Sequence, residues 1–135
     1  MTALSASYEA QRQDGIIVSV PVKADAVIYK GALVVDKGTG YAEPGVDGAS
    51  YTFLGVAVES VTGGSADGEK EIRVYKTGSF VYSKDSAAAT DLGVQMMIHD
   101  DNTVGASSSN SIACGYVVGI PDSSHVRVRI DLAAK

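Results

Sequence analysis

The sequence predicts an all-β fold, a compact β-barrel or sandwich of about ten short strands preceded by an extended N-terminal arm. Short apolar runs recur at a spacing of roughly 8–12 residues, and turn-forming residues separate them. The hydrophobic share of 45% is carried by Val, Ala, Ile and Tyr more than by Leu, and the chain has 15 Gly and no Trp. Residues of these types favour strands joined by tight turns.

A weak internal duplication supports this fold class. Each half begins with a Gly-led apolar passage, continues through a polar stretch, reaches a second Gly-led strand and ends in an alternating strand. The two Gly-to-Gly separations are similar, 24 residues from Gly31 to Gly55 and 22 from Gly93 to Gly115. Such repetition predicts one closed β structure built from two like halves. The matched passages are 30–36 with 92–100, 54–58 with 114–119, and 71–76 with 126–131.

The first half divides into an arm and a series of short strands. Residues 1–14 are polar and show no period-two pattern, so they are expected to form the arm, and residues 15–135 a single β domain. Pro21 lacks an amide donor, which places it at a sheet edge or at a strand end. Strands are expected at 16–22, 32–36, 41–43, 52–61, 69–76 and 79–83.

The second half repeats the pattern after one candidate helical turn at 84–91. Strands are expected at 94–98, 112–120 and 125–132, with a polar loop at 103–111 and a tight turn at 121–124. The last strand alternates most regularly, which predicts one apolar face in the core. The residues of that face are Val126, Val128, Ile130 and Leu132.

Composition argues against several classes of partner. The net charge is −5 and the pI about 4.8, so binding to nucleic acid or to an anionic membrane surface is not expected. The sequence has no apolar run of 18 residues and no secretory signal. Cys114 is the single cysteine, which excludes an intrachain disulfide and suggests synthesis in a reducing cytoplasm.

The residues that could carry catalysis are few. His99 and His125 are the two imidazoles, and neither accompanies a nucleophile motif. Cys114 lies in an apolar strand, where a cysteine acts as a small hydrophobe. The run Asp100-Asp101-Asn102 lacks the calcium-loop pattern and is expected to be a solvated turn. We therefore expect a protein that is not an enzyme and has no cofactor or metal site.

Three passages resemble the capsid decoration (cement) proteins of tailed bacteriophages. They are KGALVVD at 30–36, LGVAV at 54–58 and IRVYKTG at 72–78. The resemblance implies a viral structural protein on the capsid surface of the virion, made in the host cytoplasm. It further implies that the major capsid protein is the partner, that the protein stabilises the head, and that it forms a homo-oligomer, often a trimer.

Two readings of the function follow. In the first, residues 1–20 contact the shell, residues 1–14 by adding a strand to a shell protein's sheet, with Leu4, Tyr8, Arg12 and Ile16 as contact residues. In the second, the chain is a carbohydrate- or receptor-binding β module of a fibre or surface assembly that uses Tyr41, Tyr51 and the polar loop 103–111. A small β-barrel enzyme with an Asp or His site is the least favoured reading.

Overall fold

The computed structural model describes residues 3, 5–7, 15–131 and 133–135. These residues form twelve strands and one short 3-10 helix, and every strand ladder is antiparallel, which confirms the all-β prediction. In chain order the elements are β1 (Ile17–Pro21), β2 (Val27–Ile28), β3 (Leu33–Asp36), β4 (Ala42–Pro44), β5 (Thr52–Ala57), β6 (Val61–Thr62), β7 (Glu71–Tyr75), β8 (Ser79–Ser83), η1 (Ala89–Asp91), β9 (Gln95–Ile98), β10 (Val104–Gly105), β11 (Ala113–Asp122) and β12 (His125–Arg129).

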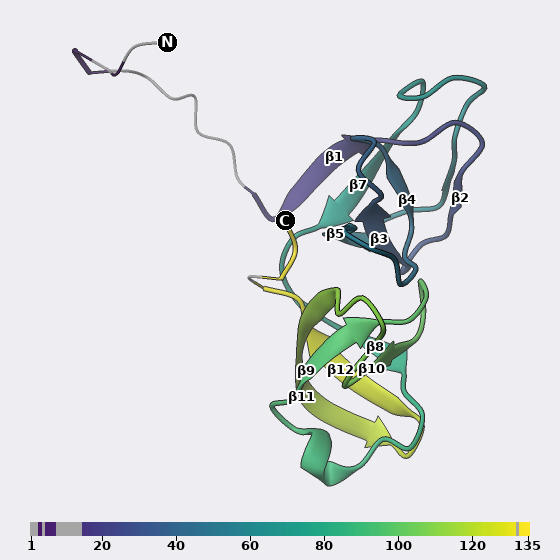
Figure 1. The fold of residues 1–135 in the computed structure, drawn as a ribbon, viewed down its shortest axis with the longest axis vertical. Helices are drawn as coiled ribbons and strands as arrows, with labels where there is room; N and C mark the ends of the chain where they lie inside the picture. The colour runs from purple at the N-terminus through teal and green to yellow at the C-terminus, as the bar shows by residue number, and fades with distance from the viewer. Residues whose placement is uncertain (1–2, 4, 8–14, 132) are drawn as a thin grey trace.

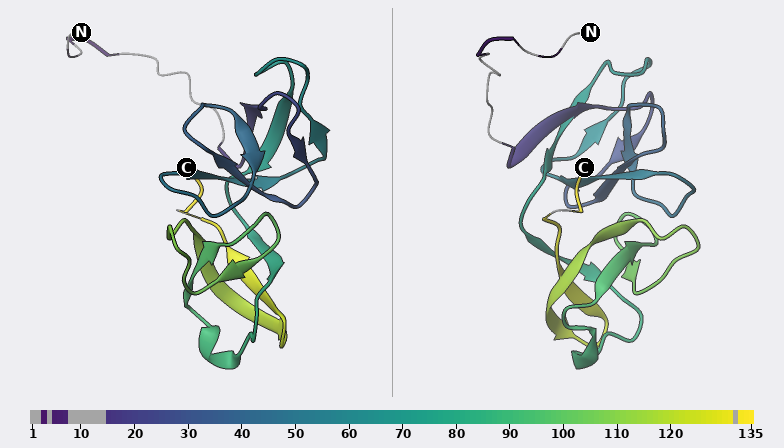
Figure 2. Two further views of the ribbon diagram at one scale, coloured as in Figure 1. Left: turned by 45° about the vertical axis from the view of Figure 1, so that its right-hand side comes forward. Right: turned by 60° about the vertical axis from the view of Figure 1, so that its left-hand side comes forward.

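The described chain forms two lobes that stack along the long axis of the molecule (Figures 1 and 2). The first lobe, residues 15–76, holds a five-stranded sheet in the order β1-β7-β5-β3-β4. The second lobe, residues 78–131, holds a five-stranded sheet in the order β8-β12-β11-β9-β10. The two orders match strand for strand along the chain. The duplication predicted from the sequence is therefore present in the topology.

The first matched glycine pair supports the same equivalence at the level of single hydrogen bonds. Gly31 and Gly93 both have positive φ, 87° and 81°. Each donates its amide to a carbonyl of the Gly-led strand beside it, Gly31 N to Ala57 O and Gly93 N to Val117 O, both at 2.9 Å. The two halves therefore share the turn that leads into the central strand pair.

The second matched pair lies at a β-bulge in each sheet. Gly55 has φ 141° and Gly115 has φ 144°, values that residues with a side chain rarely adopt. The register shifts by one residue beside each glycine, so Leu54 in β5 and Cys114 in β11 are the extra residues of the two bulges. The bulge at Gly55 is thus repeated at Gly115.

Neither sheet closes into a continuous barrel within residues 15–131. The two edge strands of each sheet meet at one isolated parallel bridge, Val22 with Ala42 in the first lobe and Ser83 with Thr103 in the second. One bridge does not make a ladder, so the closed structure expected from the duplication does not form, and a sandwich-like packing of sheets fits the fold. Pro21 ends the edge strand β1, as predicted. The predicted arm, residues 1–14, lies almost wholly outside the described residues.

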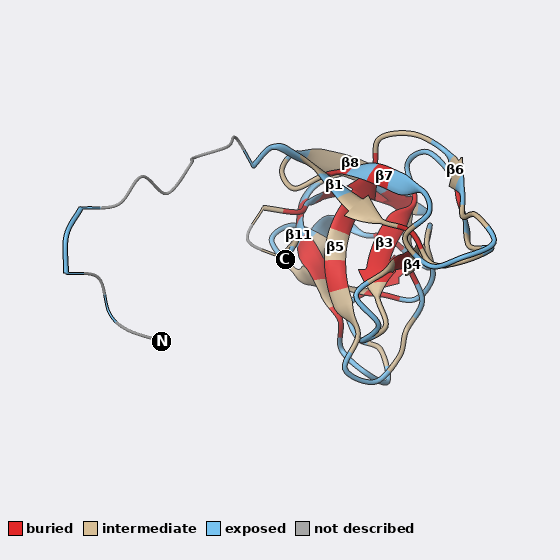
Figure 3. Cartoon of the chain, turned by 90° about the horizontal axis from the view of Figure 1, so that it is seen from above, coloured by how far each residue is buried: buried red, intermediate tan, exposed pale blue. Residues whose placement is uncertain are grey.

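Two hydrophobic clusters fill the lobes, and one of them crosses the boundary between them. Val34, Ile72 and Val74 belong to a cluster confined to the first lobe. Alternate residues point to the other side of the same sheet. There Leu33, Val35, Phe53 and Val56 join the core of the second lobe, which includes the predicted Val126, Val128 and Ile130. The central strands β3 and β5 of the first sheet are therefore largely buried on both faces (Figure 3). Leu132 lies outside the described residues.

Several strand bounds differ from the predictions. The expected strand 52–61 divides into β5 and β6, because the chain bends at residues 58–60, where Ser60 Oγ accepts the amide of Lys30 at 2.8 Å. The expected loop 103–111 contains β10, whose buried side chain is that of Val104. Helix η1 falls inside the candidate turn 84–91. No helix among the described residues is long and apolar enough to cross a bilayer.

The C-terminal residues return to the first lobe, where Lys76 joins both ends of the described body. Lys76 N donates to Ile16 O at 2.8 Å, and Lys76 Nζ donates to Leu54 O at 2.5 Å and to Lys135 O at 2.6 Å. Lys135 N donates to Phe53 O at 2.8 Å. Partial burial lowers the pKa of Lys76 from its usual value. These bonds hold residues 133–135 against β5.

Candidate functional site

The structure describes one of the four residues expected to contact a shell. Ile16 lies just before β1 and its side chain is 58% exposed. Ile17, the first residue of β1, is also exposed, at 40%. Leu4, Tyr8 and Arg12 lie outside the described residues. The start of the β domain, directly after the predicted arm, therefore presents apolar side chains at the edge of the first sheet.

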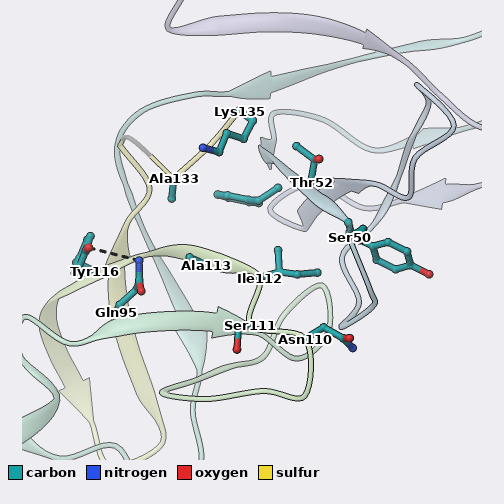
Figure 4. Close-up of a pocket in the computed structure, with 12 residues that line it drawn as sticks. Ser50, Thr52, Gln95, Asn110, Ser111, Ile112, Ala113, Tyr116, Ala133 and Lys135 are labelled. Carbon is teal, nitrogen blue, oxygen red and sulfur yellow. Dashed lines mark hydrogen bonds between the residues drawn. The ribbon is translucent and has the colours of Figure 1, made fainter.

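A pocket of about 590 Å³ lies where the two lobes meet (Figure 4). The apolar side chains of Phe53 and Ile112 are both nearly buried there, at 2% and 7% exposure. The polar lining comes from the start of β5, from β9 and from the segment before β11. Gln95 Nε2 donates to Tyr116 Oη at 3.4 Å. The lining residues are Ser50, Tyr51, Thr52, Phe53, Gln95, Asn110, Ser111, Ile112, Ala113, Tyr116, Ala133 and Lys135.

Hydrogen bonds between the lobes hold the loops beside this pocket. Asp47 Oδ1 accepts from Ser108 Oγ at 3.3 Å and from Asn110 N at 3.2 Å. Asp47 N donates to His99 O at 3.3 Å. The Tyr51 ring lies 5.7 Å from Lys37 Nζ, within the range of a cation–π contact. The pocket thus presents hydroxyl, amide and aromatic groups, and hydrogen bonds between the two lobes hold the loops that carry them.

The structure brings together part of the set expected for a carbohydrate- or receptor-binding module. Tyr51 and residues 110–111 of the polar loop line the same pocket. Tyr41 does not line it, because its ring lies 5.8 Å from Lys23 Nζ, and Gly68 is near the same ring. Gln95 and Tyr116 line the pocket although the sequence did not single them out for it. Their strands were predicted, but their position beside Tyr51 depends on how the two lobes pack.

The two histidines have local roles in turns. His125 Nδ1 lies 2.8 Å from Asp122 Oδ1 and 3.2 Å from Ser124 Oγ. A serine–histidine–aspartate relay needs the acid and the nucleophile on opposite ring nitrogens. Here both contact the same nitrogen within one exposed turn, an arrangement that ties the turn together. His99 Nε2 lies 2.8 Å from Ser107 O, which ties the 99–107 loop.

The other residues considered for catalysis or metal binding are buried in the core or lie in a local turn. Cys114 is buried, and burial raises the pKa of its thiol to about 12. Asp100 Oδ1 accepts the amide of Asn102 at 2.8 Å, which is the local turn bond expected there. Burial and the neighbouring Asp100 raise the pKa of Asp101. Among the described residues no three His, Cys, Asp or Glu side chains gather as a metal site would require.

Comparison with known proteins gives a likeness of fold. No protein-family model and no curated protein matches the chain. The chain resembles the solved structure of the N base of the head fiber protein gp8.5 of bacteriophage phi29, with a TM-score of 0.52. The likeness covers 88% of this chain and 97% of that chain, at 17% sequence identity. At this identity the likeness establishes a shared fold, which spans both lobes.

Proposed function

We propose that the chain is a non-enzymatic structural protein of a phage virion, which binds the outer surface of the head and stabilises the capsid. The observation that carries this proposal is the fold shared with the head fiber base of bacteriophage phi29 over 97% of that chain. The resemblance of three sequence passages to capsid decoration proteins points to the same setting. The major capsid protein is the proposed partner.

The described structure suits this role physically. The central strands β3 and β5 are largely buried on both faces, and the C-terminal residues join the lobes, so the body has the packing of a stiff block. The edge strand β1 follows the predicted arm directly. An edge strand with exposed Ile16 and Ile17 is a surface that a shell protein could extend by strand addition.

The test is co-sedimentation with empty heads of the phage whose genome encodes the chain. Deleting residues 1–14 should abolish binding to the heads, because the deletion removes Leu4, Tyr8 and Arg12. The melting temperature should stay within a few degrees of the intact chain, because the described core lies within residues 15–135. Tyr8→Ala should weaken binding, whereas Tyr29→Ala, at an exposed tyrosine of the first lobe, should not.

Two results would contradict the proposal at different levels. Equal occupancy of heads by the intact and shortened chains would show that the arm is not the contact. A failure of the intact chain to sediment with any head preparation would remove the virion role itself.

A second function, binding of a short carbohydrate, is favoured by the pocket between the lobes. Tyr51, Asn110 and Ser111 line that pocket together with Gln95. Aromatic faces and amide and hydroxyl groups are the chemistry that recognises sugar rings and their hydroxyls. The pocket is large enough for a small ligand.

A glycan array followed by titration calorimetry tests this second function. Tyr51→Ala should lower the affinity of any glycan that binds by at least about tenfold, because a hydroxyl and a ring face are lost. Tyr41→Ala is the matched control, since Tyr41 lies outside the pocket, and should leave the affinity unchanged. Equal loss in both variants would place the binding elsewhere.

A further inference from the structure

Because the lobes are duplicates, each has two equivalent surfaces: the outer side of its sheet, and the end of the lobe where its first strand starts. Within the chain, the outer side of the first sheet contacts that end of the second lobe. In the first lobe, the outer side of the β3–β5 pair is covered by the second lobe. Leu33, Val35, Phe53 and Val56 on that side are at most 2% exposed. Backbone bonds accompany this packing, from Leu33 N to Asp101 O at 2.9 Å and from Lys135 N to Phe53 O at 2.8 Å.

The same side of the second sheet is covered only in part within the described chain, because Gln95, Met97 and Ala113 are half-buried whereas Tyr116 is exposed. The matched glycines place Gln95 at the position of Leu33, Ala113 at that of Phe53, and Tyr116 at that of Val56. Tyr116 is 49% exposed, whereas Val56 is 1% exposed. We call this side the second-sheet face and define it by Leu92, Gln95, Met97, Ala113, Tyr116 and Val118.

This face is apolar at its centre and hollowed beside it. Leu92 and Val118 are 61% and 46% exposed. A hollow of about 570 Å³, with Gly93, Val118 and Arg129 in its lining, borders Tyr116 on one side. The pocket between the lobes borders it on the other side. On the second-sheet face, the side chain of Tyr116 therefore protrudes between two depressions.

The part of the second lobe that covers the first sheet also has a counterpart, which lies in the first lobe. Within the chain, the start of β8 takes part in the cover, and the Phe80 ring lies 5.5 Å from the Tyr75 ring. The bonds Lys76 N to Ile16 O and Ile130 N to Gly78 O are equivalent, so the start of β1 matches the start of β8. Val18 stands at the position of Phe80. We call Ile16, Ile17 and Val18 the β1 end.

The two unused surfaces hold most of the exposed apolar side chains. Nine large hydrophobic residues are exposed among the described residues, and five of them are Ile16, Ile17, Leu92, Tyr116 and Val118. In tandem structures each unit buries its face on the next unit, and the terminal units that end an array carry a polar outer face. The two end surfaces of this chain carry exposed apolar side chains instead.

We propose that the second-sheet face of one copy binds the β1 end of another copy, which repeats between molecules the contact that the two lobes make within one. The contact is heterologous, because two different surfaces meet, so successive copies form a closed ring if the rotation permits. It rests on the proposed function for its setting in a virion, and identifies the surfaces by which the homo-oligomer expected from the sequence resemblance would assemble. Self-association is measured without heads, so the two proposals fail separately.

The experiment measures molar mass by light scattering after size exclusion, over a range of concentrations. The intact chain should have a mass of two or more times 13.9 kDa at high concentration. Tyr116→Asp and Ile17→Asp should each weaken association at least about tenfold, because each places a charge in an apolar contact. Tyr29→Asp is the matched control, since Tyr29 is 65% exposed and lies on neither surface.

Mixing the two variants gives the sharpest outcome. Each variant keeps one intact surface, so an equimolar mixture should form a dimer with one native junction and no larger species. If either charged variant melts early, Tyr116→Gln and Ile17→Ser replace it. An intact chain that stays monomeric at every concentration overturns the proposal. A mixture that stays monomeric overturns it too, because a contact between two like surfaces would not be restored by mixing.

Discussion

Replacing Gly115 by alanine tests whether the bulge in the second lobe has the same tight backbone geometry as the bulge at Gly55 in the first. Gly115 has φ 144°, and a Cβ built there overlaps the carbonyl oxygen of Arg129 on β12. It also comes within 2.9 Å of Val128 Cγ1. The obstruction is backbone rather than a flexible side-chain end, so β12 has to move away from β11.

The cost has two parts. An alanine held at this φ costs about 1–3 kcal/mol in backbone strain. Displacement of β12 weakens two neighbouring ladder hydrogen bonds, at about 1 kcal/mol each. Together they lower the free energy of unfolding by about 3–5 kcal/mol, which for a domain of this length lowers the melting temperature by about 10–18 °C.

Thermal and urea denaturation of Gly115→Ala, Gly55→Ala and Gly119→Ala measure this effect. Gly55 has the same backbone angle and the same overlap, with the carbonyl of Tyr75, so it should behave like Gly115. Gly119 lies on the same strand as Gly115, and its Cβ would meet only Arg127 Cβ at 3.6 Å. Its alanine variant should be within about 0.5 kcal/mol of the wild type. A Gly115→Ala variant as stable as Gly119→Ala would refute the bulge geometry.

Two further predictions concern the second lobe. Val128→Asp should unfold the protein or lower the free energy of unfolding by more than about 4 kcal/mol, because Val128 is fully buried. Val81 lies on the neighbouring strand and is 40% exposed. In the same denaturation assay, Val81→Asp should change the free energy of unfolding by no more than about 1 kcal/mol. The pKa of Asp131 is lowered from 3.8 to about 2 by hydrogen bonds from Thr77 and Gly78 and by Arg129, so its contribution to stability is present above about pH 4 and is lost as the pH falls toward 2. Acid titration of Asp131→Asn, followed by circular dichroism, should show a smaller loss over that interval, and an identical acid transition would contradict it.

The strands could be predicted because their burial follows a simple period. In β7 and β12 every second residue is buried, and each pattern was legible from alternation alone. The two glycine pairs could be matched in the sequence because a positive φ, at the turn of Gly31 and Gly93 or at the bulge of Gly55 and Gly115, favours glycine. Local chemistry therefore accounts for the elements and for their duplication.

The packing of the lobes could not be predicted by the same means. The run of Leu33, Val34 and Val35 is apolar on both faces, which indicates burial on both sides without saying what covers each. Gln95, the polar counterpart of Leu33, gave no sign that it lines a pocket with Tyr51. Likewise β10 rests on one apolar residue, Val104, whose burial arises from strand pairing rather than from a period.

The junction at Lys76 bears on where the protein tolerates added sequence. Its backbone amide donates a hydrogen bond to the carbonyl of residue 16, and its ammonium group donates one to the carbonyl of residue 135. Both ends of the folded body therefore lie next to the same residue. A short linker could therefore join the two ends, and new termini could be opened at the exposed Asp122–Ser124 turn. A cargo fused after Lys135 would crowd the same region from which the arm departs. A cargo inserted in the 122–124 turn would leave that region clear.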